Sequence, residues 1–440
     1  MTRKNSRNKP PPRRIAAELV IDRLGTKGDG IGRLDSGETV YVPYVLPGER
    51  VRVTLGGRRG EGVEGELEAI LQLAADRVEP ECLHFGQCGG CALQHLDVAR
   101  YRALKLARIS SALTRQGVTG AAINDLLVSP KGTRRRVTFS AESGRSPRQP
   151  SVVVGFNRRA SHALVDLDEC SVTRPTIVAL LPALRSLLVA ILPSGGQADI
   201  AVTEASSGLD VLIEATAALD LAAREHLSEF ASEARLARLM WRAPGGAAEP
   251  IAIRDPVFMR FGPRDVAIPP AAFLQATEFG ENAIVQAVLS ALPAEGRVAD
   301  LFAGCGTLSF PIAAAGHVVL AVEGDEAALA ALSRAARQGG DRISVERRDL
   351  ERSPLEAAEL NGFAAVVVDP PRIGAKAQSR ALAYSTVPVV IAVSCDPESF
   401  ARDAAILIEG GYRLCWVQPI DQFLWSAHVE LVALFRRELP

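Results

Sequence analysis

The segment that decides the fold of this chain covers residues 300–307 and reads DLFAGCGT. It ends an apolar run, and Gly304 and Gly306 follow at the point where a strand would turn into a helix. Glycines in such a turn let the backbone approach a ligand, and an acidic residue about 20 positions further on can bind ribose hydroxyls. Glu323 stands at this spacing, at the end of the next apolar run. The segment therefore predicts a nucleotide-type ligand at the first turn of an α/β sheet.

Strand-length apolar runs alternate with helix-length segments from about residue 268 to the end of the sequence. The expected strands cover residues 298–302, 318–323, 343–347, 364–369 and 389–394, followed by a closing pair at 412–417 and 428–435. Alternation of this kind predicts a doubly wound parallel sheet. We therefore assign residues 266–440 to an α/β domain.

Residues 15–73 follow a different pattern, in which short strands are separated by tight turns. The expected strands cover 15–24, 39–45, 50–55 and 65–72, and glycine-containing breaks lie at 28–30, 35–37, 47–48 and 56–57. Several strands in so short a segment must close into a small barrel to remove their exposed edges. The segment resembles a TRAM domain, an oligonucleotide-binding-type barrel that is found attached to RNA-modifying enzymes.

The middle of the chain gives weaker signals. An amphipathic helix is expected at 97–116, with Asp97 as its N-cap and Gly117 as its stop. Residues 124–265 mix strands and helices without a recognisable motif. We assign residues 74–265 to a central α+β domain and expect the helix to pack on the C-terminal domain.

Composition restricts the class of protein. The 440 residues suffice for about three domains, and 48% hydrophobic with 23% charged residues is the balance of a globular chain. No run reaches the ~18 apolar residues of a membrane span, and the basic N-terminus lacks the apolar core of a secretory signal. We expect a cytoplasmic protein with no membrane contact, in which the seven cysteines serve metal or catalytic roles rather than disulfides.

Basic residues are clustered although the net charge is only -1. A basic tail covers residues 1–14, and a second cluster opposes a single Glu142 and consists of Lys131, Arg134, Arg135, Arg136, Arg145, Arg148, Arg158 and Arg159. Such clusters are typical of surfaces that bind phosphate backbones. A solvated face and an unstructured tail would carry the same residues.

Two ligands suit the loop at 300–307. A dinucleotide usually requires a third glycine, which packs the helix against the strand around the pyrophosphate, and this loop continues with Thr307 instead. S-adenosylmethionine has no pyrophosphate and tolerates the shorter form. We therefore favour adenosylmethionine over nicotinamide or flavin cofactors, with Asp349, after the third strand, placed to meet the adenine.

Two further motifs follow the fourth and fifth expected strands. They read Asp369-Pro-Pro-Arg372 and Ser394-Cys395-Asp396-Pro397, and in an open α/β sheet both would line the same crevice as the glycine loop. Cys395 is either a small buried hydrophobe or a nucleophile. A nucleophilic thiol must be accessible and partly deprotonated, and we expect a helix beginning after Pro397 to lower its pKa.

These motifs resemble those of the RNA (uracil-5-)-methyltransferases, in particular their ribosomal RumA/RlmD-type branch. The resemblance implies that Cys395 adds to carbon 6 of uracil, and that Glu430, in a His-Val-Glu motif, removes the proton from carbon 5. It places Asp369 at the uracil edge and cofactor region and Gln275 of a Phe-x-Gln motif on the cofactor. The remaining cofactor positions are Phe302, Gly304, Gly306, Thr307, Glu323 and Asp349. Thr277 and Thr307 depart from the family, since each stands where an asparagine occurs in it.

Four cysteines have the spacing of a metal site: Cys82, Cys88, Cys91 and the distant Cys170. Four thiolates suit either tetrahedral zinc or a [4Fe–4S] cluster, and the spacing alone does not choose between them. The motif at 88–95, CGGCALQH, resembles the loop that binds [4Fe–4S] in the ribosomal branch, which implies an iron–sulfur cluster. Cys305 and Cys415 are interpreted as packing residues.

The resemblance therefore implies an adenosylmethionine-dependent enzyme that methylates a uridine in 23S ribosomal RNA. We expect the target base to be flipped out of a single-stranded or loop region, and the enzyme to act as a monomer. One alternative is the same chemistry on transfer RNA, whose enzymes we expect to lack the barrel and the cluster. Another is a non-catalytic RNA-binding factor for ribosome assembly. Amino-methyltransferases share Asp-Pro-Pro but carry an aromatic residue next, where this chain has Arg372.

Overall fold

The computed structural model describes residues 15–146, 151–217 and 219–437. The chain forms two compact units. The barrel unit contains the N-terminal barrel with residues 91–101 and 425–427, and the large unit contains residues 81–90, 102–424 and 428–440. The basic tail at 1–14 and Arg148 lie outside the described residues. Among the residues described, no helix is long and apolar enough to cross a membrane.

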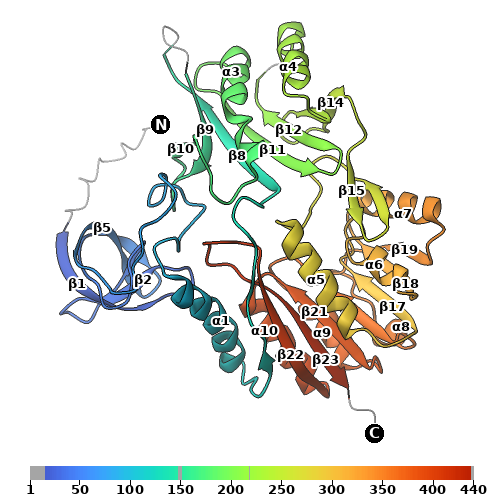
Figure 1. Cartoon of the computed structure of the whole chain (residues 1–440). Helices are drawn as coiled ribbons and strands as arrows, with labels where there is room; N and C mark the ends of the chain where they lie inside the picture. Colours follow the sequence, from blue (N-terminus) through green and yellow to red (C-terminus); the bar gives the residue numbers. More distant parts are fainter. Residues whose placement is uncertain (1–14, 147–150, 218, 438–440) are drawn as a thin grey trace, which may run out of the picture. The chain divides into compact units, whose positions relative to one another are not determined.

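Five strands of the barrel unit close in the order β1-β2-β3-β5-β4 (Figure 1). Their bounds are Ile15–Leu24, Gly30–Arg33, Thr39–Val42, Arg50–Arg59 and Gly62–Gln72 for β1 to β5. Alternate apolar side chains, including Ile21, Val40 and Val53, fill the interior. The sequence pattern predicts a turn at 28–30 and no strand between residues 24 and 39, so it misses β2. A Cβ on Gly32 would lie 2.4 Å from the Val20 carbonyl oxygen, so a glycine inside this strand reflects close strand approach rather than a turn.

A seven-stranded mixed sheet occupies the central part of the chain, in the order β10-β9-β8-β11-β12-β13-β14. The strands are β8 (Arg136–Ser143), β9 (Val152–Asn157), β10 (Leu164–Asp166), β11 (Gln197–Ala205), β12 (Gly208–Ala215), β13 (Arg238–Arg242) and β14 (Glu249–Ile253). Its helices are α2 (Pro175–Val178), α3 (Leu181–Ile191) and α4 (Leu221–Glu233), and a separate hairpin is formed by β15 (Phe258–Phe261) and β16 (Arg264–Ala267). Leu184 of α3 and Leu227 of α4 share one core with Phe139 of β8.

The C-terminal part of the chain is built on a nine-stranded sheet, in the order β19-β18-β17-β20-β21-β23-β22-β6, with β7 also paired to β22. The strands are β6 (Ala122–Ile123), β7 (Leu127–Val128), β17 (Arg297–Leu301), β18 (Val318–Glu323), β19 (Ile343–Arg347), β20 (Ala365–Val368), β21 (Val389–Ser394), β22 (Tyr412–Asp421) and β23 (Glu430–Arg437). Strands β17 to β21 pair in parallel, and β23 pairs with β21 in the antiparallel sense. The predicted α/β class is confirmed.

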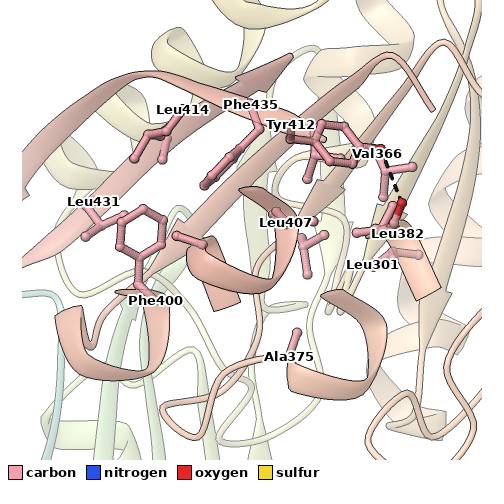
Figure 2. Packing of buried hydrophobic residues seen from close by; sticks show 14 of the residues in the cluster. Leu301, Val366, Ala375, Leu382, Phe400, Leu407, Tyr412, Leu414, Leu431 and Phe435 are labelled. Atoms are coloured by element: carbon pink, nitrogen blue, oxygen red, sulfur yellow. Dashed lines mark hydrogen bonds between the residues drawn. The ribbon is translucent and has the colours of Figure 1, made fainter. Parts of the chain in front are cut away.

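Helices pack on this sheet and bury its apolar side chains. They are α5 (Glu278–Ala291), α6 (Ser309–Ala314), α7 (Glu326–Gly339), α8 (Ala357–Leu360), α9 (Lys376–Ala383) and α10 (Pro397–Glu409). Phe400 and Leu407 of α10 lie against Phe435 of β23 (Figure 2). The Tyr412 hydroxyl donates to the carbonyl oxygen of Leu382 at 3.5 Å, which ties β22 to the end of α9. The end of β21, which precedes Cys395, therefore rests on a hydrophobic core.

Helix α1 (Val98–Arg115) lies within one residue of its predicted bounds at each end. The Asp97 carboxylate accepts the Arg100 N–H at 2.9 Å, and Gly117 has a φ of 73° beyond the last turn. Ile109 and Leu113 belong to the same core cluster as Val366 of β20. The apolar stripe seen in the sequence is thus buried against the nine-stranded sheet.

Candidate active site

Three chain segments bring their polar ends to one edge of the nine-stranded sheet. Val368, the last residue of β20, pairs with Ala392 of β21, and Ser394 at the end of β21 pairs with Leu431 of β23. Asp369 and Cys395 therefore follow neighbouring strands, while Glu430 begins the antiparallel one. The register alone places a thiol between two carboxyl groups.

A chain of side-chain hydrogen bonds joins these two carboxyl groups. Gln275 Nε2 donates to Asp369 Oδ2 at 3.2 Å. Gln422 Nε2 donates to Gln275 Oε1 and to Glu430 Oε2, both at 2.7 Å. Gln275 and Gln422 are buried, and so is Glu430. Gln275, the residue expected on the cofactor, is thus connected through Gln422 to Glu430, the residue expected to be the base.

Both carboxyl groups hold protons more tightly than usual. Burial raises the pKa of Glu430, and the charge of Asp369 raises it further. Burial also raises the pKa of Asp369, with a further contribution from Asp300. Carboxyl groups perturbed in this way can exchange protons near neutral pH, which is the property a general base requires.

The thiol of Cys395 does not have the lowered pKa that its position before a helix suggested. Burial raises its pKa to about 11, and Glu430 adds to this shift, although Arg372 opposes it. Helix α10 does begin at Pro397, but the Asp396 side chain accepts the N–H groups of Glu398 and Ser399 at 3.0 Å. The first turn of α10 is therefore capped by a carboxylate, and its amides do not stabilise the thiolate.

The glycine loop after β17 has the shape of a ligand cradle. Gly304 has a φ of 53°, and a Cβ there would have no atom within 4 Å, so the space beside it is open. Gly306 has a φ of 96°, and a Cβ there would lie 2.6 Å from the Phe310 ring. Phe302 adopts a φ of 65°, which is rare outside glycine. The loop backbone is thus held in a strained turn whose residues are buried or half-buried.

Acidic groups line this cradle. Glu323 accepts the N–H of Gly304 at 2.8 Å and the N–H of Asp325 at 2.7 Å, so its carboxylate stands directly beside the loop. Asp300 Oδ1 is buried and has no hydrogen-bond partner, while its other oxygen accepts the Ser309 hydroxyl at 2.5 Å. A buried acceptor without a partner is costly. Open space beside Gly304, the adjacent Glu323 carboxylate and an unsatisfied acceptor together fit a cationic, nucleoside-containing ligand such as S-adenosylmethionine.

The other predicted cofactor residues differ in setting. Thr307 lies half-buried in the loop, close to Gly306. Asp349 is exposed after β19, where its Oδ1 accepts the Glu351 N–H at 3.1 Å. Thr277 is the N-cap of α5, because its hydroxyl accepts the Gly280 N–H at 2.9 Å, which explains why a threonine is tolerated there.

Sequence reasoning missed two residues near the site. Lys105 of α1 is fully buried, and its Nζ donates to Asp421 Oδ1 at 2.8 Å, as well as to the carbonyl oxygens of Phe423 and His428. Gln422 is the second. Isolated Lys and Gln residues form no recognisable motif. Only residues 421–422 could have been noticed, because they lie a few positions before the His-Val-Glu motif.

Part of the basic cluster has a structural role. Arg135 is buried and donates to Glu281 Oε2 at 2.5 Å and to the Gln275 carbonyl oxygen at 3.2 Å. It therefore supports the segment that carries Gln275 and is not available to a phosphate. Arg136 lies over the exposed ring of Phe273, 4.9 Å from its centre.

The four cysteines of the expected cluster are half-buried. Cys82, Cys88 and Cys170 lie in the large unit, and Cys91 belongs to the barrel unit. Burial raises the pKa of Cys82 and of Cys88, and the thiol of Cys170 contributes to both shifts. Nevertheless, no group of three or more His, Cys, Asp or Glu side chains in the described ranges is arranged to hold a metal ion.

Known proteins resemble this chain in its barrel domain and in its fold. The TRAM domain family matches residues 17–55, within the barrel. The fold also matches the crystal structure of the Pyrococcus abyssi tRNA (uracil-54, C5)-methyltransferase in complex with S-adenosyl-L-homocysteine, with a TM-score of 0.73 and 22% identity over 95% of this chain and all of that one. Fold and site together define an α/β methyltransferase with an N-terminal TRAM barrel.

Proteins of similar sequence show to which family of methyltransferases the chain belongs. An uncharacterized RNA methyltransferase of Mesorhizobium japonicum is 43% identical over 96% of this chain and 98% of its own length. The 23S rRNA (uracil(1939)-C(5))-methyltransferase RlmD of Chromohalobacter salexigens is 32% identical over 96% of this chain and 90% of its own length. The chain belongs to the RNA (uracil-5-)-methyltransferase family, a class of adenosylmethionine-dependent enzymes, and the predicted resemblance is confirmed.

Proposed function

We propose that this enzyme transfers a methyl group from S-adenosylmethionine to carbon 5 of a uridine in 23S ribosomal RNA. The observation that carries the proposal is the pairing of Ser394 with Leu431, which sets Cys395 beside Glu430 at the sheet edge. A thiol and a carboxyl group side by side are the two groups that methylation of carbon 5 requires.

Cys395 acts first in this proposal. Its sulfur forms a bond to carbon 6 of uracil, which moves electron density to carbon 5 and makes that atom nucleophilic. The thiol is protonated at rest, since its pKa is about 11. The sulfur releases its proton to solvent as it adds to carbon 6, and Arg372, which lowers the pKa of the thiol, favours the thiolate that forms.

Glu430 acts second. S-adenosylmethionine, when bound, supplies the electrophilic methyl group. The cradle residues Gly304, Glu323 and Asp300 would hold it, together with Gln275, Phe302, Gly306, Thr307 and Asp349. Asp369 would contact both the cofactor region and the uracil edge. Once carbon 5 is methylated, Glu430 removes the remaining proton from that carbon. The carbon 5–carbon 6 double bond then forms again, and the bond between carbon 6 and Cys395 sulfur breaks.

The RNA partner is inferred from the family and from the surface near the site. The exposed Phe273 ring with Arg136 over it suits stacking on an unpaired base, two residues from Gln275. We propose that the chain acts as a monomer, with residues 15–73, 74–265 and 266–440 as its barrel, central and catalytic domains.

A transfer RNA target is the second candidate. The Pyrococcus abyssi enzyme matches 95% of this chain, barrel included, so the presence of a barrel does not separate the two targets as we had expected. Identity of 32% to a 23S enzyme supports ribosomal RNA. The test is to map 5-methyluridine in 23S and transfer RNA from cells that lack the protein. The same cells are then mapped after they receive either the wild-type protein or Cys395→Ala. Loss from 23S RNA that only wild type repairs supports the proposal, and loss from transfer RNA alone overturns it.

We also propose that Cys82, Cys88, Cys91 and Cys170 hold a [4Fe–4S] cluster, with zinc as the alternative. Two observations support this proposal. The Cys170 thiol contributes to the raised pKa of both Cys82 and Cys88. The Gly90 N–H donates to Cys88 Sγ at 3.4 Å. Hydrogen bonds to ligand sulfurs are typical of such clusters. Protein purified without oxygen should be brown and contain iron and sulfide, and Cys88→Ser should remove both. Colourless protein with bound zinc would contradict the proposal.

A further inference from the structure

Gln422 is a buried amide whose side-chain atoms are all engaged at the centre of the site. It follows β22 directly and is 2% exposed. Its Oε1 accepts the backbone N–H of Ala276 at 2.8 Å, and its Nε2 donates to Gln275 Oε1 and Glu430 Oε2. One side chain therefore contacts both the segment 275–276, which carries the expected cofactor residue Gln275, and the proposed base Glu430.

The orientation of this amide is fixed by its surroundings. A backbone N–H can only donate, so the oxygen of Gln422 must face Ala276, and its NH₂ group must face the two other partners. Gln275 then receives a hydrogen bond on its oxygen and turns its own NH₂ group to Asp369. The direction of every hydrogen bond between the two carboxyl groups follows from one backbone donor.

Helix α5 leaves room for this arrangement. A Cβ on Gly280 would lie 2.7 Å from Gln422 Cβ and 3.0 Å from its Oε1. Gly280 is held in the first turn of α5 through its N–H bond to the Thr277 hydroxyl. Any larger residue at position 280 would displace the Gln422 amide. The position of Gln422 therefore depends on the first turn of α5 as well as on residues 275–276.

We propose that Gln422 is the positioning residue of the reaction: it holds Glu430 through Oε2, so that Oε1 receives the proton from carbon 5, and it fixes Gln275 at the same time. This inference rests on the proposed function. Gln422 touches neither reacting atom. It sets the direction of the base, and misplacement of a catalytic group by about 1 Å can cost on the order of 100-fold in rate.

The test compares Gln422→Met and Gln422→Glu with the wild-type enzyme in methylation of a 23S RNA fragment. Met keeps the length of the side chain but donates no hydrogen bond, so we expect kcat to fall roughly 10- to 100-fold with little change in KM. Because proton removal follows methyl transfer, a covalent RNA–protein adduct should accumulate on denaturing gels. A purely structural role would lower the amount of folded enzyme and would not produce the adduct.

Gln422→Glu adds a titration readout. The new carboxyl group keeps an acceptor for Ala276 but repels Glu430, which already faces Asp369, Arg372 and Cys395. This repulsion raises the pKa of Glu430. Release of the adduct should therefore require a higher pH in Gln422→Glu than in the wild-type enzyme. Gln422→Met also loses the hydrogen bond that lowers the pKa of Glu430, so its release of adduct should move to higher pH as well. Its rate should nevertheless stay below that of wild type at every pH, because the base is also misplaced.

Gln418→Met is the matched control, since Gln418 lies on β22 but donates to the Asp125 carbonyl oxygen at 2.8 Å, outside the site. It should keep wild-type kcat and form no adduct. If Gln422→Met and Gln422→Glu both turn over like wild type without adduct, the inference fails, although Cys395→Ala remains inactive. Turnover by Cys395→Ala would instead remove the proposed function itself.

Discussion

Ser394 and Leu431 face each other across the antiparallel pair of β21 and β23. This single pairing sets Cys395, the residue after Ser394, beside Glu430, the residue before Leu431. The two residues come from segments 35 positions apart, and neither lies in a helix that could move independently. A shift of the pairing by one residue would turn Glu430 to the opposite face of the sheet. The register of β23 is therefore part of the chemistry.

Cys395→Ala should abolish RNA methylation while adenosylmethionine binding remains close to that of wild type. The thiol follows β21, whereas the cradle is formed by Gly304 after β17 and Glu323 at the end of β18, so removing the sulfur leaves the cradle intact. Methyl transfer to RNA and equilibrium binding of the cofactor are the two measurements. Cys415→Ala, a half-buried cysteine on β22, is the control and should be fully active. Measurable turnover without Cys395 would exclude covalent catalysis.

Glu430→Gln should form the RNA adduct but fail to release it. The amide keeps the size of the side chain and its contact with Gln422 but cannot accept a proton, so turnover should fall by roughly 10²- to 10⁴-fold. A protein band shifted by the mass of the RNA, stable to denaturant, is the expected result. Product formed at the wild-type rate, without such a band, would assign the base to another residue.

Activity should rise with pH through the neutral range. Cys395 must lose its proton and Glu430 must be deprotonated, and the pKa of each is raised, so both are predominantly in their inactive forms at lower pH. Arg372 lowers both pKa values. In Arg372→Met the ascending limb of the pH profile should therefore move to higher pH, while Lys376→Met, on α9, should leave it in place. An unchanged profile in Arg372→Met would contradict this electrostatic assignment.

Lys105→Met should destabilise the protein strongly. Lys105 and Asp421 are both fully buried, and loss of the ammonium group leaves an uncompensated carboxylate, at a cost of about 3–5 kcal/mol. The midpoint of urea unfolding measures this. Lys105→Met with Asp421→Leu should recover most of the loss, whereas Arg115→Met, which breaks an exposed pair with Glu398, should cost about 0–1 kcal/mol. Equal effects of the two single changes would disprove a structural ion pair.

Sequence periodicity predicted the strands of the nine-stranded sheet well because buried parallel strands are continuous apolar runs. The predicted range of β18, 318–323, is the observed one, and Gly304 and Glu323 lie beside each other as their spacing indicated. The sequence did not predict the order of the central sheet, because β8 and β11 alternate polar and apolar residues, a pattern that fits several topologies. The strand β2 was missed because glycine marks close strand approach as well as turns.

The sequence by itself determined the class of fold, the glycine cradle and the motifs that end in Asp369, Cys395 and Glu430, because each depends on residues close together in the chain. Only the tertiary structure decided which groups meet: that Gln422 joins Gln275 to Glu430, that Arg135 is buried against Glu281, and that Cys395 has a raised pKa. Hydrogen bonds and desolvation depend on distances between segments far apart in sequence, and local patterns of residues do not contain those distances.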